Sequence, residues 1–382
     1  MRLPLALVAL CGSLLGPATG SAQARDSATV AVRVAQAVCD RQVVVLGELP
    51  SHGEGRAFAI KARIVEHLVS RCGFGAVLFE APIYDFLGFE EAVAARSADQ
   101  LRLDRAIGGF WWTRELSEWR RWLFERAARG GLVLGGVDDQ PSATSHHGRA
   151  VLPGLVGAAL PEGEAADATE CEQAVTRNLF WRYDESHRFD ATEQERLERC
   201  AGAAASRVRG DTGTARRAML ENLAGYYARE RGAAGVPSRD EVMYRNVRWY
   251  EARMPSAGKY IVWTATVHSA RGQGELERKP LGAWLAAERG ERLAVIGFSA
   301  FAGQSSRAGG PSKPIPEAPA GSLEAQATAD KAFVFLDNGA LRAIGGVPSR
   351  LFGKFLSAEW GALFDGVVVI REEVAPVFEV RR

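Results

Sequence analysis

The sequence predicts an α/β fold with a mainly parallel sheet flanked by helices on both faces and with an inserted helical subdomain. Short, continuous apolar runs alternate along the chain with segments of helical periodicity. Strands buried on both faces read as continuous apolar runs, and strands that alternate with helices form parallel sheets. Residues 150–235 carry helical patterns without any such run.

The first predicted elements set this rhythm. Residues 26–39 have the pattern of a short helix, and the apolar run 42–47 (QVVVLG) ends in a Gly, as a buried parallel strand does. A helix is expected over 55–71, where six apolar side chains gather on one side. The run 76–79 (AVLF) predicts the second buried strand.

The later elements continue the alternation. Helices are expected over 84–96 and 113–129, and the apolar run 132–137 predicts a third strand. Further strands are expected at 259–266, 293–298, 331–336 and 366–370.

Two stretches interrupt the alternation. Within 150–235, helices are expected at 171–183, 192–207 and 214–231, and we interpret them as an insertion packed over one end of the sheet. Residues 301–326 are rich in Gly, Pro, Ser and Ala and predict a long loop, of the kind that often forms a lid.

The amino terminus has the pattern of a secretory signal peptide over residues 1–24. Arg2 precedes an apolar run, and Ala22-Gln23-Ala24 matches an A-x-A cleavage site before Arg25. The run is too short for a permanent transmembrane helix, and no later segment has 18 consecutive apolar residues. We therefore expect a secreted or periplasmic protein without a membrane span, with one α/β domain over 25–382.

Charge and cysteine content narrow the class further. Lys and Arg number 47 against 46 Asp and Glu, so the basic excess of a nucleic-acid-binding protein is missing. In an oxidising compartment the remaining four cysteines allow two disulfides. Cys39 and Cys72 precede neighbouring strands and are expected to pair, as are Cys171 and Cys200 on successive helices. Four buried free thiols are the alternative.

Ionisable side chains collect where the predicted strands end. Glu48 follows the first strand with His52 close behind, Glu80 ends the second, Asp138 ends the third, and His268 follows the fourth. Ligands of open parallel sheets bind beyond the carboxyl ends of the strands. Singly, each residue could instead be a helix cap, a turn residue or a structural histidine.

Common hydrolase signatures are absent from the sequence. It has no G-x-S-x-G elbow, no H-E-x-x-H zinc motif and no P-loop. A site of histidines and carboxylates remains, which suits activation of water by a general base and equally suits a metal ion.

The segment 43–53 (VVVLGELPSHG) resembles the opening motif of the erythromycin esterase family, in which a strand ends in Gly-Glu and a His follows. Further matches come in order along residues 40–300. These are Lys61, Phe79-Glu80-Ala81, Val137-Asp138-Asp139-Gln140, and the Arg239-Asp240-x-x-Met243-x-x-Asn246 pattern. The resemblance implies an α/β fold and hydrolysis of an ester or lactone.

Three positions depart from the family pattern. Three residues separate Glu48 from His52, where the family usually has two, and a Glu common after the first His is replaced near Arg56. Ala265 and Thr266 stand where the family often has His-Asn before its second His. More distantly, the sequence resembles haem- or iron-handling proteins and metal-dependent peptidases with a Gly-x-x-His start.

The mechanism that we expect is hydrolysis without a covalent enzyme intermediate. His52 is the general base, Glu48 or Glu80 orients its ring, and His268 stabilises the oxyanion together with a cation. The substrate-binding candidates, which include the two cations considered for that role, are Lys61, Arg56, Asp138 and Arg239.

The expected partner is a small-molecule substrate, with no nucleic acid. No cofactor is expected, although a metal ion is possible. Two alternatives stay open: an exported metal- or haem-binding protein built on the same four residues, and a catalytically degenerate family member. The sequence leaves the oligomeric state open.

Overall fold

A computed structural model describes the chain over residues 18–141, 145–160, 165–180, 190–208, 210, 214–254, 258–308 and 310–379. The central sheet has eight strands, ordered β3-β2-β4-β1-β5-β10-β7, with β6 paired to β5. The strands are β1 (Val43–Glu48), β2 (Phe74–Pro82), β3 (Val133–Asp138), β4 (Lys259–Ala265), β5 (Leu293–Ser305), β6 (Lys313–Ile315), β7 (Phe333–Asp337) and β10 (Gly366–Glu373). A separate pair joins β8 (Pro348–Ser349) to β9 (Leu356–Ser357).

Parallel pairing dominates the sheet. The strands β3, β2, β4, β1, β5 and β10 pair in parallel with their neighbours, and only β7 and β6 run antiparallel to theirs. The predicted α/β class is therefore confirmed, and the four strands that end near the candidate residues lie side by side.

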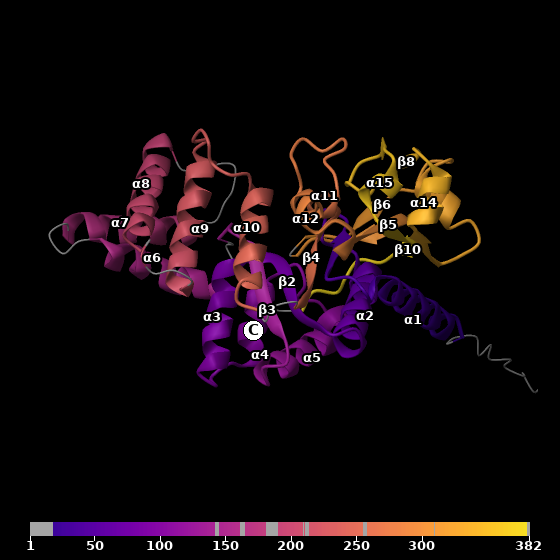
Figure 1. Ribbon diagram of the computed structural model, residues 1–382, viewed down its shortest axis with the longest axis horizontal. Helices are drawn as coiled ribbons and strands as arrows, with labels where there is room; N and C mark the ends of the chain where they lie inside the picture. Colours follow the sequence, from indigo (N-terminus) through magenta and orange to yellow (C-terminus); the bar gives the residue numbers. More distant parts are fainter. Residues whose placement is uncertain are drawn as a thin grey trace, which may run out of the picture.

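Helices cover both faces of the sheet (Figure 1). One face packs on α1 (Ala18–Val38), α2 (Gly55–Arg71), α4 (Gln100–Ile107) and α5 (Ser117–Ala128), which follows a short turn η1 (Arg114–Leu116). The other packs on α3 (Ile83–Ala94), α10 (Arg239–Glu251) and α12 (Leu281–Arg289). The short helices are α11 (Thr266–Ser269), η3 (Gly290–Arg292), α13 (Leu323–Ala327), α14 (Asn338–Ile344) and α15 (Trp360–Leu363).

The region predicted as a helical insertion lies between β3 and β4. It holds α6 (His146–Ala159), α7 (Ala165–Phe180), α8 (Ala191–Arg207) and α9 (Ala215–Glu230), which stand together beyond α3 and α10 at the left of Figure 1. Their apolar sides join the core cluster of that face of the sheet.

The long loop predicted over 301–326 is wrong in part, because regular structure interrupts it. The strand β5 continues to Ser305 and pairs with β6, and α13 follows at Leu323. The last residues of β5 are only partly buried. They are held by pairing with β10 and β6 rather than by packing on both faces of the sheet. Gly303, with φ +131°, makes this possible, since a Cβ there would meet the backbone of Glu373.

The amino-terminal helix α1 begins at Ala18 and crosses the predicted cleavage position before Arg25. The rest of the predicted signal peptide, residues 1–17, lies outside the described residues. Within the described part of the chain, no helix is long and apolar enough to cross a membrane.

Two disulfides tie the fold. Cys39 pairs with Cys72 at the amino-terminal edge of β1 and β2, and Cys171 pairs with Cys200 between α7 and α8. Both bonds are those expected from the sequence. The strands that follow Cys39 and Cys72 are not neighbours as expected, since β4 lies between β1 and β2, but all three are parallel and begin at the same edge of the sheet.

Removing the first disulfide should destabilise the protein measurably. For a separation of 33 residues the chain-entropy model assigns the cross-link roughly 3–4 kcal/mol. We expect Cys39→Ser/Cys72→Ser to lower the free energy of unfolding by about that much in urea denaturation monitored by circular dichroism. A variant with the same urea midpoint as the oxidised wild-type protein would contradict this stabilising role of the disulfide.

Candidate active site

The site is assembled by the carboxyl ends of four adjacent strands. Glu48 is the last residue of β1 and pairs in register with Ala265, the last of β4. Glu80 lies near the end of β2, and Asp138 ends β3. His268 follows β4 on the short helix α11. Parallel register therefore brings these side chains to one edge, as the sequence predicts.

Glu48 is completely buried and accepts hydrogen bonds from several directions. Its Oε1 accepts from Trp111 Nε1 at 2.8 Å, and its Oε2 accepts from Trp263 Nε1 at 2.9 Å and from Lys61 Nζ at 2.6 Å. Burial opposes ionisation of this carboxyl, but Lys61 and His52 outweigh it and hold its pKa below the usual value. Glu48 is thus a fixed, ionised acceptor for His52.

His52 contacts both acids of the predicted pair. Its Nδ1 lies 2.7 Å from Glu48 Oε1, and its Nε2 lies 3.8 Å from Glu80 Oε1. Phe110 stacks on the ring at a centroid distance of 5.0 Å, and Trp111 meets its edge at 5.6 Å. Burial lowers the pKa of His52, but the charges of Glu80 and Glu48 prevail and raise it.

The longer spacing between Glu48 and His52 is absorbed by a turn. The N–H of His52 donates to the carbonyl of Leu49, and His52 adopts φ +49°. A non-Gly residue in this left-handed region is strained by about 1–3 kcal/mol and persists only where its surroundings hold it. The next residue, Gly53, fits because a Cβ there would collide with the backbone of Ser306. The extra residue therefore leaves the imidazole on Glu48.

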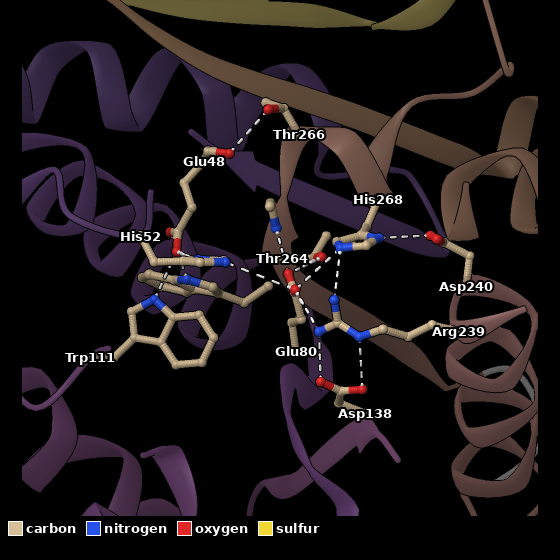
Figure 2. Close-up of polar contacts among 12 residues, drawn as sticks. Glu48, His52, Glu80, Trp111, Asp138, Arg239, Asp240, Thr264, Thr266 and His268 are labelled. Atoms are coloured by element: carbon tan, nitrogen blue, oxygen red, sulfur yellow. Dashed lines mark hydrogen bonds and ion pairs between the residues drawn. The ribbon is translucent and has the colours of Figure 1, made fainter. Parts of the chain in front are cut away.

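Glu80 is the centre of the site (Figure 2). Its Oε2 accepts from Thr264 Oγ1 at 2.7 Å and from the N–H of Ala265 at 2.8 Å. Its Oε1 faces His268 Nε2 at 3.3 Å and Arg239 Nη2 at 3.1 Å. Burial would raise its pKa, but His268, His52 and Arg239 lower it well below the usual value. Glu80 is therefore a carboxylate facing two imidazoles.

Helix α10 supplies the partners of His268. Asp240 Oδ1 lies 2.8 Å from His268 Nδ1, and Arg239 makes a two-pronged contact with Asp138 at 3.0 and 2.6 Å. Burial lowers the pKa of His268, but Glu80 and Asp240 dominate and raise it to about 10. His268 is therefore a cation at neutral pH. The start of α10, which carries Arg239 and Asp240, is capped by Ser238, whose side chain accepts from the N–H of Glu241.

A cavity of about 930 Å³ opens beside this cluster. Glu80, Asp138 and Arg239 border it on the polar side. Aromatic rings line much of the rest, namely those of Phe110, Trp111, Trp112, Tyr226 and Phe378. Another cavity, of about 650 Å³, lies between α8 and α9 and has no cluster residue in its lining. The larger one is the substrate-site candidate, since it combines apolar walls with convergent polar groups.

Two predicted substrate-binding residues have other surroundings. Lys61 is completely buried beneath Glu48, and its Nζ also lies 4.1 Å from the ring centroid of Trp263. Burial lowers its pKa to about 8 despite the charge of Glu48. Arg56 bonds the carbonyl of Glu372 on β10 and lies over Phe333. These positions favour structural roles, whereas Asp138 and Arg239 face the cavity.

The sequence-based reasoning missed the aromatic donors and Asp240. Trp111 and Trp263 bind Glu48, and Phe110 covers His52. The pair Arg239-Asp240 offered a signal for Asp240, because adjacent residues at the start of a helix can both reach one strand edge. No periodic pattern marks Phe110 or Trp111.

The imidazoles and carboxylates at the carboxyl ends of the strands are of the types that can bind a metal ion. The Nε2 atoms of His52 and His268 both face Glu80 Oε1, while each Nδ1 has a carboxylate partner. Imidazoles that bind metals carry such partners. However, His268 is protonated at neutral pH, so its Nε2, 3.4 Å from the guanidinium of Arg239, has no lone pair for a metal ion. Within the described residues, no group of three such side chains has metal-binding geometry.

The comparison with known families identifies the scaffold. A family model described as erythromycin esterase matches residues 69–373. The chain belongs to the erythromycin esterase family. The matched range begins after Glu48 and His52, so for these two residues the family likeness rests on the motif itself. Membership of this family supports an esterase-like hydrolase.

Solved structures share this family's fold. A protein from Bacillus cereus is 19% identical, with a TM-score of 0.67 over 91% of this chain and 92% of its own. A succinoglycan biosynthesis protein is 14% identical, with a TM-score of 0.69 over 96% and 100%. A mutant of the erythromycin esterase EreC in its open conformation is 14% identical, with a TM-score of 0.58 over 90% and 93%. No curated protein sequence matches the chain.

The buried pair of Lys61 and Glu48 should be strongly coupled. Lys61→Met removes the ammonium partner of a buried carboxylate, and breaking such a buried pair costs roughly 3–5 kcal/mol. We expect that loss in the free energy of unfolding, measured by urea denaturation. The double variant Lys61→Met/Glu48→Gln should lose less than the sum of the two single variants. Arg63→Met, an exposed change on the same helix, is the control. Additive losses would contradict the coupling.

Proposed function

We propose that this member of the erythromycin esterase family is an exported hydrolase in which His52 activates water to attack an ester or lactone carbonyl. The observation that carries the proposal is the position of His52. Its Nδ1 is bound to the ionised Glu48, while its Nε2 faces the carboxylate of Glu80 at the edge that borders the cavity. A general base needs such an oriented ring, with its basic nitrogen within reach of the water whose proton it accepts.

The geometry supports a water-activation step. A hydrogen bond from Nδ1–H of His52 to Glu48 leaves Nε2 as the basic atom. A water held between Nε2 and a substrate carbonyl gives its proton to Nε2 as its oxygen bonds to the carbonyl carbon. The charge of Glu48 stabilises the imidazolium that forms, as the acid of a catalytic triad does. The imidazolium then protonates the departing alkoxide, leaving a carboxylic acid and an alcohol.

The cation that stabilises the oxyanion together with His268 differs from the two considered from the sequence, Lys61 and Arg56. Lys61 is sealed beneath Glu48 and Arg56 lies against β10, so neither faces the cavity. Arg239 borders the cavity, and His268 is cationic beside it. A fixed donor aimed at a developing oxyanion contributes about 3–4 kcal/mol. We therefore assign this role to Arg239 and His268.

Export fits the covalent structure. Disulfides form and persist in oxidising compartments and are rare in the cytosol. The chain has two, and its amino terminus has the pattern of a signal peptide. We accordingly place the protein outside the cytoplasmic membrane, in the periplasm or the medium.

A metal-binding function is the second candidate, because two imidazole Nε2 atoms converge on one carboxylate. Elemental analysis of protein purified without added metals separates the two. A stoichiometric transition metal would favour the binding protein. Turnover of esters that persists after dialysis against a chelator would favour the hydrolase, in which Arg239 supplies the positive charge.

Loss of His52 should abolish most of the activity. With p-nitrophenyl esters and a panel of macrolactones as probes, we expect His52→Gln to lower kcat by roughly 10²–10⁴-fold without unfolding. Glu80→Gln should also lower kcat, and the double variant should lose less than the product of the two effects. His67→Gln, on the middle of α2, is the control. Hydrolysis by His52→Gln at the wild-type rate would end the proposal.

The pH profile of kcat/KM should have two limbs. His52 must be neutral to act, so the rate should rise with pH through a pKa above the ordinary 6.5 of histidine. His268 must be protonated, so the rate should fall again near its pKa of about 10. Asp240→Asn removes a charge that raises the latter pKa. It should move the alkaline limb to lower pH and leave the acid limb in place. An unmoved alkaline limb would contradict the role of His268.

A further inference from the structure

The carboxyl-terminal segment 374–379 lies against residues 111–115, far away in the sequence. Phe378 and Thr113 form an antiparallel bridge. The N–H of Glu379 donates to the carbonyl of Trp112 at 3.1 Å, and the N–H of Arg114 donates to the carbonyl of Val377 at 2.8 Å. Residues 377–379 are therefore paired with the segment that carries aromatic residues of the site.

Glu379 fastens this pairing with its side chain. Its Oε2 accepts from Trp112 Nε1 at 3.0 Å and from Arg120 Nη2 at 2.5 Å. Arg120 is buried and also pairs with Asp104 at 2.9 Å. One carboxylate thus joins the chain end to α5 and to the Trp112 side chain. Hydrogen bonds to charged groups are worth about 1.5–3 kcal/mol each.

The segment that Glu379 holds positions the proposed base. Trp111 donates to Glu48 Oε1, the atom that His52 also contacts, and Phe110 stacks on the His52 ring. The outer side of Phe110 faces solvent, since this residue is 42% exposed. Two glycines precede it, and Gly108 has φ +84°. Glycine allows a wider range of backbone conformations before Phe110, whereas the residues that follow it are paired with residues 377–379.

We propose that the carboxyl-terminal segment, through Glu379, is a positioning element for His52. It clamps residues 111–115, and these in turn hold Phe110 and Trp111 against the ring and its carboxylate partner. Phe378 and Glu379 also line the cavity, so the same segment forms one wall of the substrate site. The expected effect on kcat rests on the proposed function, whereas the effect on the position of the His52 ring does not.

Loosening the clamp should misplace the base without unfolding the protein. Glu379→Ala leaves Arg120 paired with Asp104, so the core beneath α5 stays neutralised. The segment 111–115 then loses the side-chain part of its restraint on Phe110 and Trp111, while the backbone pairing with residues 377–379 stays. Because a displacement of 1 Å can cost about 100-fold in rate, we expect kcat for a p-nitrophenyl ester to fall by roughly 10- to 100-fold.

The direct readout is the NMR signal of His52 in protein labelled with ¹³C-histidine. A stacked phenyl ring shifts the Cε1–H proton upfield, and His52→Gln assigns the signal. Phe110→Ala gives the value for complete loss of stacking. We expect Glu379→Ala to move the signal towards that value, and Trp112→Phe, which removes one of the two side-chain bonds, to move it part of the way. Glu372→Ala, an exposed acid on β10, is the matched control.

The outcomes separate this inference from the proposed function. A His52 signal at the wild-type position in folded Glu379→Ala would overturn the inference, even if the ester is hydrolysed. A signal that moves in a protein without any hydrolysis would support the positioning role and count against the hydrolase. A moved signal together with the lower kcat, and neither effect in Glu372→Ala, would support both.

Discussion

One ionised carboxylate, buried at the end of β1, holds the site together. Glu48 has no exposed surface, and it receives Lys61, Trp111, Trp263 and His52 on its two oxygens. A buried charge is tolerated only when it is paired and fully hydrogen-bonded. The four donors come from α2, β4, the segment before α5 and the turn after β1, so satisfying one acid requires all four elements to be in place.

The same constraint repeats one strand away and gives the site its charge. Glu80 is ringed by Thr264, Ala265, Arg239 and His268, and the last two are held by Asp138 and Asp240. The alternating acids and bases keep Glu80 ionised and His268 protonated within a poorly solvated edge. His52 stands between the two acids and is the group whose protonation a reaction can change, because Arg239 is held by acids on both sides and His268 has a pKa of about 10.

The fold and the acidic and basic groups of the site were within reach of the sequence, but the aromatic donors were not. Continuous apolar runs predicted β1 to β4, and parallel register then placed Glu48, Glu80, Asp138 and His268 at one edge. A residue type alone does not reveal burial, so Lys61 looked like a substrate ligand while it is sealed beneath Glu48. Phe110 and Trp111 lie in an irregular segment, whose conformation depends on contacts with the distant chain end.

The spacing between Glu48 and His52 shows which feature of the family motif matters here. Three intervening residues instead of two require another turn, and the turn closes with His52 at φ +49°. The strain is of order 1–3 kcal/mol, which a charge-assisted hydrogen bond of about 1.5–3 kcal/mol to Glu48 can offset. The ring is therefore kept in place by its carboxylate partner and by Phe110 rather than by a fixed number of residues. A histidine whose backbone is strained needs its neighbours more than a relaxed one does, and this is why the distant segment that holds Phe110 and Trp111 bears on the proposed chemistry.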